Sequence, residues 1–147
     1  MKRTLILTAV ALMCLGGAAN AQGAPEALVK ARQAGMILSG NVVGGLKAAI
    51  DAGQAPSSQR GAVRGLARWA HTLPELFPDG TDPDTVDTGA RPAVWTDRDG
   101  FNAKAAEFAA AVDRLSELSQ GEDAAAFSAQ WSVVRAGCQS CHDVYKD

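Results

Sequence analysis

Between Pro74 and Trp95 the chain is so dense in Pro, Gly and Asp that no periodic segment survives. Glycine and proline are the strongest interrupters of regular structure. The same stretch contains Phe77, Val94 and Trp95, large apolar side chains that have little reason to sit in a disordered linker. We therefore predict a long, ordered crossover loop that divides the chain into two pairs of regular elements.

Two segments before this loop have the apolar spacing of helices. Alanine is abundant and β-branched residues are sparse, which favours helix over strand. The first segment runs from about residue 25 to residue 52, with Pro25 in its first turn. The second begins near Ser57 or Ser58 as N-cap and ends at Pro74. The apolar positions that recur are Leu28, Met36, Val42, Val43, Leu46, Ala49 and Ile50 in the first, and Val63, Leu66, Ala70 and Leu73 in the second.

Two further helices follow the loop. One runs from about Asp97 to Ser119, and the other opens at Glu122 or Asp123, whose negative charge suits a helix N-terminus. Their apolar faces comprise Phe101, Ala105, Phe108, Val112, Leu115 and Leu118, and then Phe127, Trp131, Val134, Cys138 and Cys141 or Val144. Four helices with two short connections and one long one predict an all-α fold, an antiparallel four-helix bundle in one domain over residues 22–147.

The first 21 residues have the layout of a secretory signal peptide. Lys2 and Arg3 precede an apolar run over residues 5–15, and a small-residue Ala-Asn-Ala tripeptide ends at Ala21. The run is shorter than the roughly twenty apolar residues that a membrane-spanning helix needs. We expect cleavage after Ala21 and export of residues 22–147, to a bacterial periplasm or outside the cell.

Cleavage would change both the charge and the cysteine count. The chain carries 14 Lys and Arg against 16 Asp and Glu, for a formal net charge of −2. Loss of Lys2 and Arg3 leaves 12 basic residues against 16 acidic ones, and a net charge of about −4. We expect neither nucleic acid nor an anionic membrane as a partner of such a domain. Because Cys14 leaves with the signal, Cys138 and Cys141 are the only thiols that remain.

Cys138, Cys141 and His142 form a C-x-x-C-H motif on the last predicted helix. On a helix the two cysteines are i and i+3, so their sulfur atoms emerge on one side about a turn apart. His142 follows at a rotation of roughly 100° from Cys141. Such thiols can add to the two vinyl groups at one edge of a porphyrin while the neighbouring imidazole binds its iron. The motif therefore predicts one covalently attached haem c per chain.

Three other kinds of site use similar residues. A thioredoxin-like dithiol belongs at the start of a helix that follows a strand, and the sequence predicts no strand. A structural zinc site needs four ligands, and the domain offers only the three motif residues and His71. A disulfide between Cys138 and Cys141 fits the spacing but leaves His142 unexplained. Haem attachment, which takes place outside the cytoplasm, accounts for all three side chains and for the predicted export.

With this motif near its C-terminus, the chain resembles the class II c-type cytochromes, the family of cytochrome c′ and its low-spin c-556-type relatives. "KARQAGMILSG" resembles the family's first helix, "LPELFPDGTD" and "ARPAVW" its crossover loop, and "CQSCHDVYKD" its terminal helix. The resemblance covers essentially all of residues 22–147. It implies a four-helix bundle, usually a homodimer packed through the first two helices. It also implies that Cys138 and Cys141 hold the haem vinyl groups and that His142 is the proximal iron ligand.

The resemblance assigns roles on the first helix as well. Arg32 and Gln33 are implied to approach the haem propionates, and Met36 to lie over the distal face of the haem. The spacing is compatible with this, because Arg32 and Met36 are i and i+4 and share one helix face. Lys146 stands one turn after His142, where many relatives carry Arg; it keeps the positive charge but lacks the planar guanidinium.

Met36 decides between two functions. It is the only Met of the predicted domain, because Met1 and Met13 belong to the signal peptide. In some members of the family a Met here binds iron, and in others a Met or Leu only crowds an open distal face. With both His142 and Met36 on the iron, the protein would be a one-electron carrier, which we favour. With five-coordinate iron it would bind NO or CO as a sensor, buffer or scavenger. The domain offers no distal His or acid–base pair, so we do not expect an enzyme.

Four glycines and one histidine need a separate interpretation. Gly35, Gly40, Gly44 and Gly45 each cost about 1 kcal/mol of helix propensity relative to Ala. Such a cluster indicates close approach by the haem or by a second helix. His71, near the end of the second helix, is expected to be an exposed or capping residue rather than a ligand.

Overall fold

The computed structural model describes residues 18–147, and it describes side chains from Gly23 onwards. The helices are α1 (Ala18–Asp51), α2 (Arg60–Thr72), α3 (Ala93–Thr96), α4 (Arg98–Leu118) and α5 (Ala124–Tyr145), with 3-10 turns η1 (Pro56–Gln59) and η2 (Leu73–Leu76). The described part of the chain contains no strand, only an isolated antiparallel bridge between Ala90 and Lys146. Residues 1–17, with most of the predicted signal peptide, lie outside the described residues.

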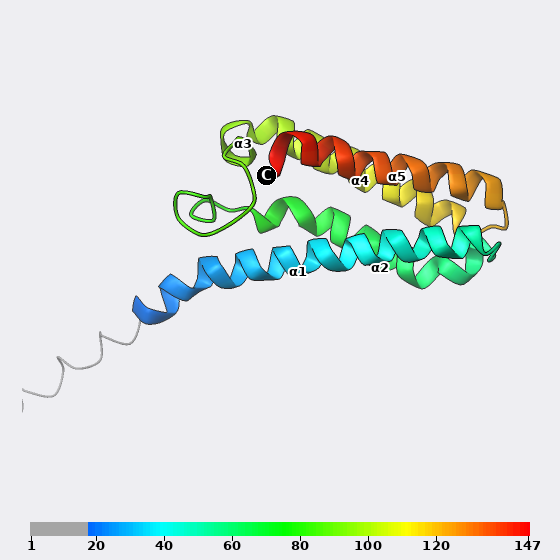
Figure 1. Cartoon of the computed structure of the whole chain (residues 1–147), viewed down its shortest axis with the longest axis horizontal. Coiled ribbons are helices and arrows are strands. Elements are labelled where there is room, and N and C mark those ends of the chain that lie inside the picture. The colour runs from blue at the N-terminus through cyan, green and yellow to red at the C-terminus, as the bar shows by residue number, and fades with distance from the viewer. Residues whose placement is uncertain (1–17) are drawn as a thin grey trace, which may run out of the picture.

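The four long helices form an antiparallel bundle (Figure 1). α1 packs against α2 and α5, and α4 packs against α2 and α5. The crossover loop between η2 and α3 lies at the same end of the bundle as the C-terminal end of α5 (Figure 1). The two short connections, α1 to α2 and α4 to α5, lie at the opposite end. The predicted four-helix bundle is therefore confirmed, and its long connection sits beside the C-x-x-C-H motif.

The core consists of one apolar stripe from each long helix. Its buried members include Val43 and Leu46 of α1, Val63, Leu66 and Ala70 of α2, Phe101, Phe108, Val112 and Leu115 of α4, and Phe127 and Val134 of α5. All of these positions were predicted from helical spacing. Burying each large side chain stabilises the fold by about 1.5–3 kcal/mol. At the end of α5 the stripe continues through Cys141 to Tyr145, whereas Val144 is 43% exposed.

The starts of α1 and α2 differ from the predictions. Pro25 lies inside α1, because this helix extends back to Ala18. Neither Ser57 nor Ser58 caps α2; the helix starts at Arg60, after the 3-10 turn η1. The reason is Pro56, whose fixed φ begins η1 and whose ring is buried, so that the chain enters α2 through a tighter turn.

The starts of α4 and α5 match the predictions. Asp97 precedes α4, and its Oδ1 accepts a hydrogen bond of 3.3 Å from the backbone N–H of Gly100. Asp123 precedes α5, and its Oδ1 accepts one of 2.9 Å from the N–H of Ala126. A side-chain cap of this kind stabilises a helix by about 1 kcal/mol.

The crossover loop is ordered, as predicted, and its apolar side chains are the reason. Phe77 and Val94 are buried, and the Phe77 ring meets the rings of Trp95 and Phe101 edge to face. The two ends of the crossover loop are more regular than expected. Pro74 in η2 and Pro92 before α3 have the fixed φ of a helical turn, so they begin short helices.

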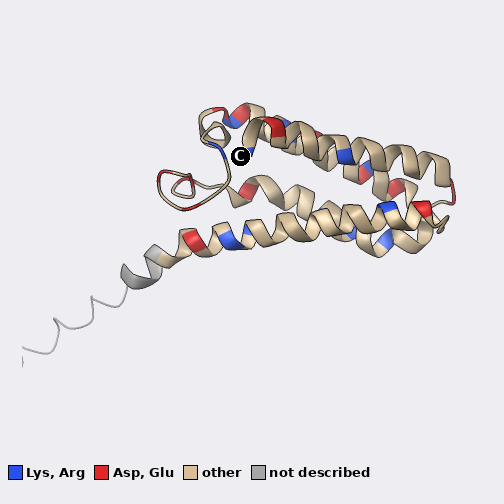
Figure 2. Ribbon diagram, viewed as in Figure 1, with Lys and Arg blue, Asp and Glu red and all other residues tan. Residues whose placement is uncertain are grey.

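Charged side chains of both signs are interspersed along the long helices (Figure 2). The crossover loop adds a run of acidic residues, Asp79, Asp82, Asp84 and Asp87. No helix among residues 18–147 combines the length and apolar character needed to cross a membrane.

One of the four clustered glycines of α1, Gly35, brings two helices into close contact. A Cβ atom at Gly35 would overlap the ring of Trp69 on α2, whereas Gly40, Gly44 and Gly45 have no neighbouring atom within 4 Å of that position. Close approach by a second helix is therefore confirmed at Gly35.

Gly35→Ala is expected to lower the free energy of unfolding by up to about 2 kcal/mol, because moving the Trp69 ring out of a packed position costs about 1–3 kcal/mol. The gain in helix propensity, about 1 kcal/mol, offsets part of this cost. Urea denaturation gives the difference. Gly45→Ala on the same helix is the matched control and should stabilise the protein by about 0.5–1 kcal/mol. Equal stabilisation by both substitutions would contradict the close contact.

Candidate functional site

Cys138, Cys141 and His142 occupy the last two turns of α5. Both cysteines are free thiols, half-buried and packed against the core. They lie on one side of the helix, as the i, i+3 spacing predicted, and the structure records no disulfide between them.

Two cavities meet at this motif, between α5 and α1. The larger has a volume of about 640 Å³ and the smaller of about 500 Å³, within the range of small-molecule and cofactor sites. Met36 of α1 and Cys141 and His142 of α5 line both, so the two cavities adjoin at these three residues. The structure thus brings together Met36 and the motif, which are far apart in the sequence.

The wall of the larger cavity is predominantly apolar. It is formed by Val43, Leu66, Trp69, Leu73, Phe108 and Trp131. Trp131 is fixed by a hydrogen bond of 2.9 Å from its Nε1 to the carbonyl oxygen of Val43. Gly40 and Gly44 line the same cavity, so two of the glycines without close neighbours face the site. Trp69 was not singled out from the sequence, because it lies beside the apolar stripe of α2 rather than on it.

Arg32 and Gln33 line the smaller cavity, together with Thr88, Gly89 and Ala90 of the crossover loop. The cavity also contacts Tyr145 and Lys146 at the end of α5. All six residues that the sequence proposed for the site therefore line one or both cavities.

Arg32 is buried, and its guanidinium is held by the crossover loop. Its Nη atoms donate hydrogen bonds of 2.8 Å to Thr81 Oγ1, 2.9 Å to the Thr81 carbonyl and 2.8 Å to Thr88 Oγ1. The guanidinium also lies 4.4 Å from the centroid of the Phe77 ring. No carboxylate of the described residues forms an ion pair with it, and burial lowers the pKa of Arg32. Its positive charge is therefore solvated mainly by neutral oxygens and an aromatic face.

The electrostatics of the thiols do not suit a redox dithiol. Burial raises the pKa of Cys138, although the nearby Arg135 opposes the shift. Burial and the neighbouring Cys138 raise the pKa of Cys141, although Lys104 opposes the shift. A reactive dithiol of thioredoxin type needs a lowered thiol pKa and a position at a helix N-terminus, and these cysteines lie near the C-terminus of α5.

The surroundings of His142, an exposed residue, favour the uncharged form of its ring, which is the form that binds metals. Burial lowers the pKa of its imidazole, and the positive charges of Lys146 and Arg135 lower it further, against the opposing effect of Asp143. At neutral pH the ring is therefore uncharged, and a ring nitrogen is available as a ligand. His71, by contrast, is exposed and pairs with Asp113, with 2.9 Å between Nε2 and Oδ2, as expected for a surface residue.

Tyr145 closes the smaller cavity next to the motif. Its hydroxyl donates a hydrogen bond of 2.7 Å to Asp97 Oδ2, and its ring packs edge-on against Phe101. Burial and the hydrogen bond to Asp97 raise the pKa of Tyr145 to about 12. The carboxylate that caps α4 thus also fixes the end of α5.

This pKa is directly measurable, because Tyr145 is the only tyrosine in the chain. We expect the phenol to ionise near pH 12 in the folded protein and near pH 10 after unfolding. Because the folded-state pKa is the higher one, the associated stability is fully present below pH 10 and is lost as the pH rises towards 12. Absorbance at the phenolate band follows the titration, with Tyr145→Phe as the blank. Ionisation of the folded protein near pH 10 would contradict a buried, hydrogen-bonded phenol.

The family of this chain follows from its sequence. The model of the family described as Cytochrome C′ matches residues 27–146. The chain belongs to the cytochrome c′ family. A cytochrome c′ of Rubrivivax gelatinosus is 36% identical over 127 residues, covering 84% of this chain and 96% of the relative. A cytochrome c-556 of Agrobacterium tumefaciens strain II Chrys is 32% identical over 121 residues, covering 80% of this chain and 95% of the relative.

The fold is also similar to solved cytochrome c′ structures. A variant of cytochrome c prime from Alcaligenes xylosoxidans, solved as a nitric oxide complex, has a TM-score of 0.76 and 26% sequence identity. The similarity covers 84% of this chain and 96% of that one. As a member of the cytochrome c′ family, the chain is a monohaem c-type cytochrome with one covalently attached haem c. Two thiols on one side, an uncharged imidazole and an apolar cavity are the features that such a group requires, so the residues present fit it.

Proposed function

We propose that this protein is a periplasmic one-electron carrier in which His142 and Met36 are the axial ligands of the haem iron. When bound, the haem supplies a one-electron iron couple. The observation that carries the proposal is that Met36 from α1 and His142 from α5 line the same pair of cavities. A thioether and an imidazole on two facing helices suit a closed site with six-coordinate iron.

The remaining residues of the site would hold and shield the cofactor. Cys138 and Cys141 would form its two thioether bonds, which leaves His142 to bind the iron from the same helix. The apolar wall around Trp69, Phe108 and Trp131 would shield the haem in the larger cavity from water. Burial and axial ligation are the main determinants of a haem reduction potential, and the proposed arrangement would provide both.

Arg32 and Gln33 would face the propionates at the smaller cavity. Support comes from Arg32, whose buried guanidinium has neutral acceptors but no carboxylate among the described residues. A buried cation is costly unless an anion compensates it. A propionate carboxylate near Arg32 would provide that compensation, and Gln33 lines the same cavity.

The second candidate function is the binding of NO or CO to five-coordinate iron, for sensing, buffering or scavenging. The solved relative that contains nitric oxide favours it. In this case Met36, which packs against the core, would fill the space over the distal face without binding the iron.

Export and assembly complete the proposal. We propose that residues 1–21 are a cleaved signal peptide, which would place the protein in the periplasm, where c-type haem can be attached.

We also propose a homodimer through α1 and α2. Its support is a pair of adjacent apolar residues on α1, Ile37 and Leu38, which are 67% and 64% exposed. The relatives are cytochromes rather than classical enzymes, and we propose no catalytic residue.

Visible spectra of the purified ferric and ferrous protein test the proposed function. We expect a low-spin spectrum, a Met-to-iron charge-transfer band in the ferric form, and no change when CO is added to the ferrous form. A high-spin spectrum that changes promptly with CO or NO would refute the electron carrier and support the second candidate.

A further inference from the structure

The last turn of α5 has unpaired carbonyl groups that must find partners. A helix leaves its last four carbonyl oxygens without intrahelical hydrogen bonds. α5 ends at Tyr145, so these oxygens belong to residues 142–145, and the first of them is that of His142. The N–H of Lys146 donates to the His142 oxygen over 3.2 Å. Three carbonyl oxygens remain.

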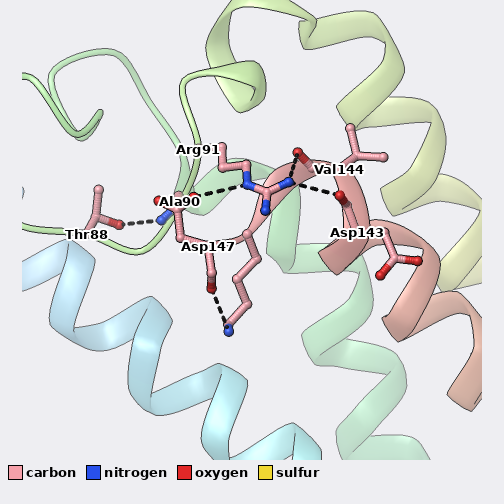
Figure 3. Close-up of polar contacts among 7 residues, drawn as sticks. Thr88, Ala90, Arg91, Asp143, Val144 and Asp147 are labelled. Carbon is pink, nitrogen blue, oxygen red and sulfur yellow. Dashed lines mark hydrogen bonds and ion pairs between the residues drawn. The ribbon is translucent and has the colours of Figure 1, made fainter.

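Arg91 of the crossover loop binds all three. Its Nη1 donates to the carbonyl oxygens of Asp143, at 2.9 Å, and Val144, at 3.4 Å (Figure 3). Its backbone N–H donates to the Tyr145 oxygen over 3.0 Å. A cation at this position also interacts favourably with the negative, C-terminal end of the helix dipole. One residue that is distant in sequence therefore caps the turn that contains His142.

Further contacts make this cap part of a larger structure. Arg91 Nε donates to Asp147 Oδ1 over 3.0 Å, and the Asp147 N–H donates to the Gly89 carbonyl over 3.0 Å. Ala90 and Lys146 pair as the isolated antiparallel bridge. Residues 88–91 and 143–147, which we call the clasp, thus hold the loop and the end of α5 together.

The clasp is tied to α1 as well. Thr88 Oγ1 accepts hydrogen bonds from Arg32 Nη2, at 2.8 Å, and from the N–H of Ala90, at 3.2 Å. Arg32 lies one turn before Met36 on the same helix. A chain of hydrogen bonds therefore connects the helix of Met36 with the last turn of the helix of His142.

We propose that Arg91 is a positioning residue for the proximal ligand, which it orients by capping the last turn of α5. The inference rests on the proposed function, in which His142 binds the iron. Helix ends open more readily than helix interiors, and His142 lies in the last turn, after the two cysteines that would tether the haem. If this turn opens, the haem stays attached but the imidazole loses its fixed orientation. The groups that orient a metal ligand also tune the properties of the metal.

Arg91→Gln in the haem-loaded protein tests this proposal. We expect amide hydrogen exchange in residues 142–146 to become about tenfold faster, because the substitution removes hydrogen bonds to the helix end. We also expect altered or broadened hyperfine-shifted proton resonances of the His142 ring in the ferric protein, and a shifted reduction potential. Arg91→Lys should restore only part of the wild-type behaviour, because an ammonium keeps the charge but lacks the planar fork.

Arg98→Gln is the matched control. Arg98 anchors the other end of the same loop through the carbonyl oxygens of Phe77, at 2.9 Å, and Pro74, at 3.1 Å, and its side chain is not part of the clasp. The Arg98→Gln variant should have a lower free energy of unfolding, with the His142 resonances and the reduction potential unchanged. Unchanged His142 resonances in Arg91→Gln would refute the positioning role, even if exchange is faster. If the wild-type protein shows no hyperfine-shifted resonances from His142, then His142 is not an iron ligand. That result would refute both the proposed ligand and the positioning role of Arg91.

Discussion

The double variant Cys138→Ala, Cys141→Ala is expected to contain no covalently bound haem. A thioether bond needs a sulfur atom, and these are the only two thiols of the domain after the proposed cleavage. Both lie on the wall of the larger cavity, so no other residue can replace them there. Mass spectrometry of the purified chain should show the mass of one haem in the wild type and none in the variant.

The single variants and a neighbouring control make this result specific. Cys138→Ala and Cys141→Ala should each retain one thioether bond, and a haem stain on a denaturing gel would detect it. Ser140 lies between the two cysteines, and its Oγ donates a hydrogen bond of 3.2 Å to the Gly137 carbonyl. Ser140→Ala removes only this hydrogen bond. It should retain the haem at the wild-type level. Haem that stays on the double variant through denaturation would refute attachment at these sulfurs.

Features that depend on local sequence were predictable. Asp97 and Asp123 cap their helices because a carboxylate accepts from backbone N–H groups three residues ahead. The crossover loop is ordered because Phe77 and Val94 are buried, as their apolar character indicated. The same holds for the motif, since a spacing of three residues on a helix places both thiols on one side without help from the rest of the fold.

Features that depend on tertiary contacts were not predictable. Arg32 binds Thr81 and Thr88, and Arg91 binds the end of α5, across more than 40 positions of sequence. An isolated Arg in a loop has the same local pattern whether it is solvated or caps a helix, so nothing in the sequence marked Arg91. The start of α2 was missed for a related reason: the buried ring of Pro56 favours a 3-10 turn where the residue types of Ser57 and Ser58 suggested an N-cap.

Substitution of Met36 is expected to change the iron site more than any other substitution outside the motif. If its sulfur binds the iron, Met36→Ala removes the sixth ligand and opens the wall shared by the two cavities. The low-spin spectrum should become high-spin, the charge-transfer band should disappear, and the ferrous form should change from no CO binding to nearly complete CO binding. Titration with CO, followed by visible absorbance, gives the bound fraction.

Met36→Leu separates ligation from packing. Leucine fills nearly the same volume as methionine but has no sulfur, so it keeps the wall and removes the ligand. If Met36 is a ligand, the Leu and Ala variants both lose the charge-transfer band. If Met36 only fills space, the Leu variant resembles the wild type and the Ala variant alone binds CO faster. In that case the wild-type iron is five-coordinate, and the same cavity wall that would insulate an electron carrier would instead limit how readily a small gas reaches the iron.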